Sequence, residues 1–257
     1  MKHSYKNIVF GATVYAAGLS SVMSHDTLLV ECGETLATDY VSCINKLTAK
    51  FNLRNSAVDN LYDKLNKRNL ISDSNIVNIY PLEGICAEYF HNVDVLLNTS
   101  VCSIEKAKSE YSVLMYNDID GYFSVKTTNI IDTTPIGVFE EYASYNYNKY
   151  LCAEVASESC GDYPYLISGR FDGEYAFGVK VDKLCSYHNA VAELHKKWKE
   201  THCKGQKITS VAAQFAYSYN SKVKQIIDDN YLFVPSCSHR SIDDAVGEGI
   251  YAAQLYK

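Results

Sequence analysis

A turn built of small residues near the start of the chain joins an apolar run to an Ala-rich segment. The turn carries Gly11, Thr13 and Ala16 in a G-x-T-x-x-A pattern, and a second apolar run ends in Glu31, 20 residues after Gly11. This spacing outlines a strand–helix–strand unit that binds a dinucleotide. Glycine permits the tight turn, the helix N-terminus faces a pyrophosphate, and the acid accepts hydrogen bonds from a ribose. Glycine is standard in the second place, so Thr13 puts a Cβ where the backbone should approach the phosphate.

A second polar cluster lies close to the C-terminus, in the segment Ser236–Arg240. Cys237 is a candidate redox thiol, because helix N-termini lower thiol pKa values. His239 is a candidate proton carrier, and Arg240 is a candidate anchor for an anionic substrate. An ordinary turn with a buried cysteine explains the same residues equally well.

Three histidines recur at a spacing of seven, at His188, His195 and His202. This spacing puts them near one face of a helix but does not bring metal ligands together. No C-x-x-C pair occurs among the nine cysteines, which favours free thiols over a zinc site or a disulfide framework. The sequence therefore predicts no metal.

The composition limits the class of protein. Among 257 residues, 47% are hydrophobic, 21% are charged, and the net charge is −6. A globular protein is indicated, and a nucleic-acid partner has no electrostatic support. No apolar run approaches the roughly 20 residues that cross a bilayer, so no membrane partner is expected. The N-terminus leads directly into the first apolar run, and we expect a cytoplasmic protein without a signal peptide.

The pattern of elements predicts an α/β fold, with a Rossmann-like layer, a β-meander and a small inserted α+β region. The turn dipeptide Asp120-Gly121 joins two strands of the meander. A separate buried strand is expected at 129–132, followed by a Tyr-rich helix at 139–156. An amphipathic helix is expected at 187–202. We assign residues 1–137 and 231–257 to the Rossmann-like domain and 138–230 to the inserted region.

Four stretches, taken in order, resemble the FAD-dependent oxidoreductases with a glutathione-reductase-type Rossmann domain. They are the initial unit with its Gly33–Thr38 segment, the stretch 80–101, the strand end Ile130–Thr134, and the closing segment 232–253. Thr13 and the Thr134-Pro135 pair depart from that family's glycines and Gly-Asp.

The resemblance implies FAD as the cofactor and assigns roles along the chain. Glu31 would hold the adenosine ribose, Thr38 would also bind the cofactor, and Val101 would meet the adenine. Gly247, expected at a helix start, would bring a backbone N–H to the flavin, where negative charge develops on reduction. The remaining implied contacts are those of the pyrophosphate (Gly11, Ala12, Thr13, Ala16) and of the dinucleotide near a strand end (Asp132, Thr133).

The implied activity is hydride transfer from a small organic or peptide-borne substrate to the flavin. Because the inserted region is small, we expect a homo- or hetero-oligomer in which a second chain completes the active site.

Two alternatives stay open. One is an NAD(P)-dependent short-chain dehydrogenase/reductase, suggested by Gly11-Ala-Thr13 and by the spacing of Tyr145 and Lys149. The other is a non-catalytic, degenerate flavoprotein-like subunit whose site is blocked by Thr13 and Pro135.

Overall fold

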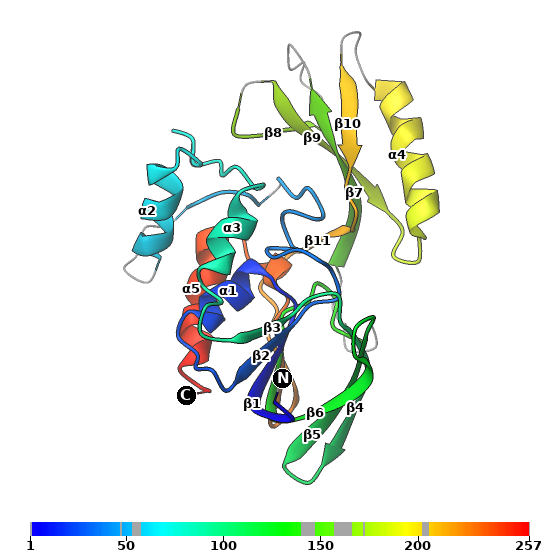
Figure 1. The fold of residues 1–257 in the computed structure, drawn as a ribbon. Coiled ribbons are helices and arrows are strands. Elements are labelled where there is room, and N and C mark those ends of the chain that lie inside the picture. Colours follow the sequence, from blue (N-terminus) through cyan, green and yellow to red (C-terminus); the bar gives the residue numbers. More distant parts are fainter. Residues whose placement is uncertain are drawn as a thin grey trace.

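The computed structural model describes seven ranges of the chain: 2–46, 48–52, 58–139, 147–156, 166–171, 173–201 and 206–256. These residues form two β-sheets placed end to end, with helices on one face of the larger sheet and one long helix on the smaller (Figure 1). The α/β fold class predicted from the sequence is confirmed.

The larger sheet is parallel at its centre. In the described residues it holds eight strands, and the order β3-β2-β1-β6-β13 runs parallel throughout, with β12 antiparallel at one edge. The strands are β1 (Ser4–Phe10), β2 (Thr27–Val30), β3 (Asp94–Leu96), β4 (Ser100–Ala107), β5 (Glu110–Asn117), β6 (Gly121–Asp132), β12 (Gln225–Asp228) and β13 (Tyr231–Phe233).

Alternation along β1 divides the core into two layers. Ile8 and Phe10 pack against the meander of β4, β5 and β6, whereas Val9 packs among the helices on the opposite face. Strands buried on both faces read as continuous apolar runs, which explains the Ile-Val-Phe sequence here.

The meander and its turn at Gly121, with φ +70°, are confirmed. The separate strand expected at 129–132 is wrong. β6 runs unbroken for 12 residues, pairing with β5 through its first half and with β1 through its second half. Near residue 127, β6 changes its neighbour from β5 to β1 without a turn.

Four helices of the described residues cover the larger sheet, and the first and the last of them cross at glycines. They are α1 (Val14–Ser20), α2 (Asp59–Lys67), α3 (Leu82–Ala87) and α5 (Ile242–Ala253). A Cβ built on Gly18 would lie 2.1 Å from the Val246 carbonyl oxygen, and one on Gly249 would lie 2.2 Å from that of Tyr15. Only glycine allows α1 and α5 to approach this closely, and α1 is thereby held with every residue buried.

The smaller sheet is antiparallel and carries α4 (Tyr187–Thr201). The ring of Trp198 on α4 packs against that of Phe177 in the sheet, with the two ring centroids 5.2 Å apart. Its strands are β7 (Tyr147–Ala156), β8 (Leu166–Ser168), β9 (Glu174–Val181), β10 (Lys207–Val211) and β11 (Ala216–Tyr219).

The helix expected at 139–156 is wrong over residues 147–156, which form β7, and residues 140–146 lie outside the described residues. Leu151, Ala153 and Val155 are buried at alternate positions between β9 and the neighbouring strands β10 and β11. The helix at 187–202 is confirmed as far as Thr201; His202 lies outside the described residues. β12, expected in the inserted region, pairs instead with the larger sheet.

A buried ion pair ties the two sheets together. The ammonium group of Lys46, from the loop after β2, lies 2.7 Å from the Glu154 carboxylate on β7, and the side chains are 3% and 13% exposed. Tyr80, before α3, donates its hydroxyl to the other oxygen of Glu154. This cluster sets the distance between the loops of one sheet and the strands of the other.

The helices in the described ranges all fall short of the length and apolarity that crossing a membrane requires.

Gly249→Ala should lower the free energy of unfolding by about 1–3 kcal/mol, because the methyl group must push α1 away from α5. Gly84 on α3 is the matched control, since nothing lies within 4 Å of a Cβ there. Gly84→Ala should be neutral or stabilise by up to about 1 kcal/mol. Urea denaturation measures both variants, and equal effects would contradict the close crossing of the two helices.

Lys46→Met should lower the free energy of unfolding by about 3–5 kcal/mol, because it leaves the Glu154 carboxylate buried without its cation. Lys64→Met is the control: its partner Glu88 also binds Arg68 at the surface, so the loss should be far smaller. Thermal unfolding of the two variants side by side gives the comparison. A larger loss for Lys64→Met would refute the role of the buried pair.

Candidate functional site

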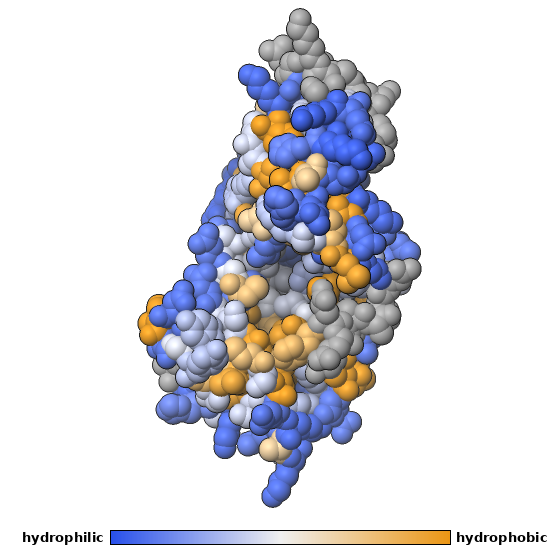
Figure 2. Space-filling view, turned by 90° about the vertical axis from the view of Figure 1, so that its right-hand side faces the viewer, coloured by the Kyte–Doolittle hydropathy of each residue, from blue (hydrophilic) through white to orange (hydrophobic). Residues whose placement is uncertain are grey.

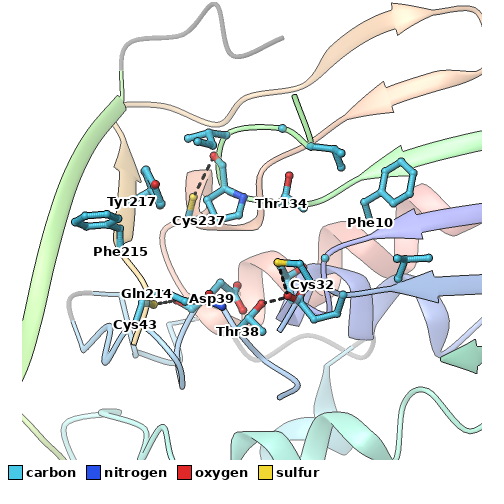
Figure 3. Close-up of a pocket in the computed structure, with 18 of the residues that line it drawn as sticks. Phe10, Cys32, Thr38, Asp39, Cys43, Thr134, Gln214, Phe215, Tyr217 and Cys237 are labelled. Carbon is cyan, nitrogen blue, oxygen red and sulfur yellow. Dashed lines mark hydrogen bonds between the residues drawn. The ribbon is translucent and has the colours of Figure 1, made fainter. Parts of the chain in front are cut away.

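A cavity of about 620 Å³ lies between the two sheets, at the carboxyl ends of β1 and β2. Ligands of open α/β sheets bind at such strand ends. Figure 2 shows the molecule hollowed between its two halves, with apolar residues gathered below the hollow. The lining comes from the turn after β1, the end of β2, the loop after β6 and the segment leading into β11 (Figure 3).

Six of the residues predicted from the sequence line this cavity. They are Gly11, Thr13, Glu31, Thr38, Val101 and Cys237. The others do not line it: Ala12, Ala16, Asp132, Thr133, His239, Arg240 and Gly247. The structure thus gathers the strand ends that were expected together, but it divides the expected catalytic group.

The turn after β1 has the expected geometry. Gly11 has a φ of +87°, and a Cβ on it would lie 3.0 Å from the Thr133 hydroxyl. That hydroxyl lies 2.8 Å from the Phe10 carbonyl oxygen, to which it donates, and 2.8 Å from the hydroxyl of Thr13. Thr133, which directly follows β6 and does not line the cavity, therefore holds the turn in place.

The N-terminus of α1 is capped by the protein's own side chains. The Val14 N–H donates to Asp39 Oδ1 at 3.1 Å, and the Tyr15 N–H donates to Ser236 Oγ at 3.3 Å. The Ser236 hydroxyl donates in turn to Asp39 Oδ2 at 2.6 Å. Thr13 Oγ1 accepts from the Ala16 N–H at 3.2 Å. A carboxylate at this position stabilises the positive end of the helix dipole.

Glu31 is likewise committed to its own chain. Its Oε2 accepts from the Ala12 N–H at 2.8 Å and from the Thr38 hydroxyl at 3.3 Å. Its Oε1 accepts from the Gly33 N–H at 2.8 Å, and the residue is 5% exposed. Both carboxylate oxygens hold the turns around the cavity.

The cavity is acidic. Burial raises the pKa of Asp39 to about 6, against the hydrogen bonds from Ser236 and Val14, which lower it; the Glu31 charge raises it further. Glu31 and Asp39 both line the cavity, and no Lys, Arg or His occurs among the described lining residues.

Asp132 lies behind the cavity and shapes its upper loop. It is fully buried, and burial raises its pKa to about 6. Its carboxylate accepts from the N–H groups of Thr134 at 3.0 Å and Val138 at 2.7 Å. The residue therefore anchors the 134–138 segment, which lines the cavity.

The polar cluster at 236–240 does not converge on one point. Cys237 lines the cavity, but burial raises its thiol pKa, and its Sγ lies 3.8 Å from the Pro135 carbonyl oxygen. His239 is buried against Tyr15 with ring centroids 5.2 Å apart, and burial lowers its pKa. Arg240 is exposed. Burial favours the protonated thiol, so Cys237 is not a ready nucleophile at neutral pH.

Gly247 does not stand at a helix start, and that expectation is wrong. α5 begins at Ile242, and Ser241 caps it by accepting from the Asp244 N–H at 3.4 Å. Gly247 is buried inside the helix. The capping serine followed by acids in the first turn was the available signal.

Lys149 argues against the dehydrogenase alternative. It lies in β7, where its ammonium group donates to the carbonyl oxygens of Lys183 at 3.0 Å and Cys185 at 2.9 Å. Its partner Tyr145 lies outside the described residues. Lys149 thus lies in a strand with its ammonium group bound to carbonyl oxygens and gives no support to the dehydrogenase alternative, which stays a prediction.

Within the described ranges, no group of His, Cys, Asp and Glu side chains is arranged to hold a metal ion.

Comparison with known proteins shows the fold. No family model matches the chain, and no curated protein matches it. Among solved structures, p-nitrophenol 4-monooxygenase from Pseudomonas putida is similar at 10% identity over 99% of this chain and 79% of its own, with a TM-score of 0.63. A geranylgeranyl bacteriochlorophyll reductase-like protein from Thermoplasma acidophilum is similar at 13% identity over 99% and 78%, with a TM-score of 0.65.

The myxobacterial chondrochloren halogenase, described as a variant of FAD-dependent halogenases, is similar at 12% identity over 99% of this chain and 74% of its own, with a TM-score of 0.61. The chain thus shares its fold with a monooxygenase, a reductase-like protein and a variant of the FAD-dependent halogenases. Likeness to the glutathione-reductase type in particular stays a prediction.

The residues around the cavity do not fit the pyrophosphate of FAD. In this class of fold a pyrophosphate binds the N–H groups at the start of the first helix. Here the N–H groups of Val14 and Tyr15 donate to Asp39 and Ser236, and the Asp39 carboxylate supplies the negative charge. Among the described lining residues there is no cation to offset Glu31 and Asp39. A bound pyrophosphate would lie beside the carboxylates of Glu31 and Asp39, at a helix N-terminus whose N–H groups already have acceptors.

Asp39→Asn should flatten the pH dependence of stability. The pKa of Asp39 is raised from 3.8 to about 6, so the folded protein binds this proton more tightly than the unfolded chain. Its contribution to stability is complete below about pH 4 and is lost as the pH rises through about 6. A difference of about 2 pKa units corresponds to about 3 kcal/mol.

Urea denaturation at a series of pH values from 4 to 7 measures this effect. The pKa of Asp132 is also raised to about 6, so in Asp39→Asn the free energy of unfolding should still fall with rising pH through the contribution of Asp132. The exposed Asp73 provides the control Asp73→Asn. An unchanged slope in Asp39→Asn would show that Asp39 is not the buried titrating group.

Proposed function

We propose that the chain binds a compact organic molecule in the cavity between its sheets and does not hold FAD through a pyrophosphate. The observation that carries this proposal is the Asp39 carboxylate, hydrogen-bonded to the Val14 N–H beside an open cavity of about 620 Å³. On this reading the protein keeps the fold of the redox enzymes and uses its strand ends for a different ligand.

The size and lining of the cavity support a small-molecule site. Pockets that bind small molecules measure about 300–1,000 Å³ and combine apolar walls with a few polar groups. Here the apolar walls include Phe10, Val30 and Phe215, and the polar groups include Thr13 and Gln214.

An FAD-dependent oxidoreductase is the second candidate. It would transfer a hydride from a small organic or peptide-borne substrate to the flavin, and Cys237, His239 and Arg240 were its expected catalytic residues. The fold shared with monooxygenases, reductases and halogenases favours it, as does the position of Glu31 at the end of β2. It requires Asp39 to leave the N-terminus of α1.

Titration with FAD separates the two candidates. We expect a purified protein without the visible absorption of a flavin, and no heat of binding when FAD is added in a calorimeter. Glu31→Ala should leave this result unchanged. Bound flavin in the purified protein, or FAD affinity that Glu31→Ala weakens by about 1 kcal/mol or more through lost ribose hydrogen bonds, would favour the oxidoreductase instead.

A second chain completing the site stays a prediction that light scattering can test. A monomer that binds its ligand alone would remove it.

A further inference from the structure

One wall of the cavity is aromatic and rigid. Tyr187, Phe215 and Tyr217 line it from α4 and from the segment at β11, and Figure 3 shows Phe215 and Tyr217 side by side across the cavity from Phe10. The rings of Tyr187 and Phe215 lie 5.9 Å apart at 69°. The Tyr187 hydroxyl donates to the Ala212 carbonyl oxygen at 2.7 Å. These contacts hold the rings in place without a ligand.

A buried cation supports the same wall from within the protein. The Lys149 ammonium group lies 4.0 Å from the centroid of the Phe215 ring and donates to two carbonyl oxygens. The residue is 8% exposed and does not line the cavity. Its charge is therefore satisfied inside the smaller sheet and is not offered to a ligand.

The floor of the cavity is anionic. Thr38 and Asp39 lie below the aromatic wall in Figure 3, and the Glu31 carboxylate lies beside them through its bond to the Thr38 hydroxyl. An anionic ligand would approach these carboxylates with no basic side chain in the described lining to pair with it. Burying an unpaired charge beside like charges is strongly unfavourable, whereas a neutral ring meets no such repulsion and a cation is attracted.

The loop of residues 134–138, which forms the roof of the cavity, is held in place by hydrogen bonds. The Tyr219 hydroxyl donates to the Pro135 carbonyl oxygen at 2.7 Å, and Asp132 anchors the same loop through Thr134 and Val138. A loop bound at both ends in this way resists being pushed outward, so a ligand must fit beneath it.

We infer that the cavity takes a flat aromatic molecule that is neutral or positively charged and carries no phosphate or carboxylate group. The ring would pack against Phe215 and Tyr217, and a positive group would face the carboxylates of Glu31 and Asp39. This inference rests on the proposed function and narrows it to one chemical class of ligand.

Riboflavin and FMN are matched probes, because they share one ring system and one side chain and differ by a phosphate. Fluorescence anisotropy of each, titrated with the full-length protein at neutral pH, should show riboflavin binding at least about tenfold more tightly than FMN. Proflavine, a flat cationic dye, should bind at least as tightly as riboflavin. Phe215→Leu should lower the affinity for riboflavin. Phe171→Leu, which changes an exposed ring outside the cavity, should leave that affinity unchanged.

Each other outcome has a defined meaning. If FMN binds as tightly as riboflavin while FAD does not bind, the inference that the ligand carries no negative charge is wrong. The proposal of a small-molecule site would still hold. Failure of both riboflavin and proflavine to bind at millimolar concentration would overturn the inferred ligand class. Tight FAD binding that depends on Glu31 would overturn the proposed function together with this inference. A riboflavin affinity unchanged in Phe215→Leu would place the ligand elsewhere and overturn the inference as well.

Discussion

The carboxylate of Asp39 at the start of α1 is the interaction around which the site is organised. It accepts the Val14 N–H and the Ser236 hydroxyl, and so joins the loop after β2 to the first helix and to the turn before α5. A helix N-terminus left open is a site for anions. Filling it from within stabilises the helix and removes the anchor that a pyrophosphate would use.

The surrounding fold makes this arrangement rigid. Gly18 and Gly249 allow α1 and α5 to pack backbone against backbone, and Ser236 is presented just before α5 begins. On the other side, the Lys46–Glu154 pair fixes the loop after β2 against the smaller sheet. The cavity lies between these two fixed regions, so its walls are set before any ligand arrives.

Proteins that share this fold can bind different ligands, because binding depends on individual atoms at the site. The chain has the fold of monooxygenases, a reductase-like protein and a halogenase, at 10–13% identity. What a fold of this kind binds depends on the few donors and charges at its strand ends. Here those atoms are two carboxylates, aromatic rings and hydroxyls, a set suited to a compact ligand without negative charge.

Local pattern in the sequence determined much of the architecture. The turn at Gly11, the paired apolar runs of β1 and β2, the hairpin at Gly121 and the amphipathic α4 were all predictable, because each depends on residues close in the chain. The position of Glu31 at the cavity followed from the apolar run of β2, whereas Val101, in the antiparallel strand β4, was assigned only through the family resemblance.

Tertiary structure alone decided the rest. Residues 147–156 form β7 rather than a helix because neighbouring strands on both sides of the segment outweigh its local preference. The role of Asp39 depends on Ser236, 197 residues further along, and no local pattern links the two. Contacts between residues far apart in the chain produce no periodic pattern in the local sequence. The hydrogen bonds and charges of the cavity could therefore be identified only from the folded structure.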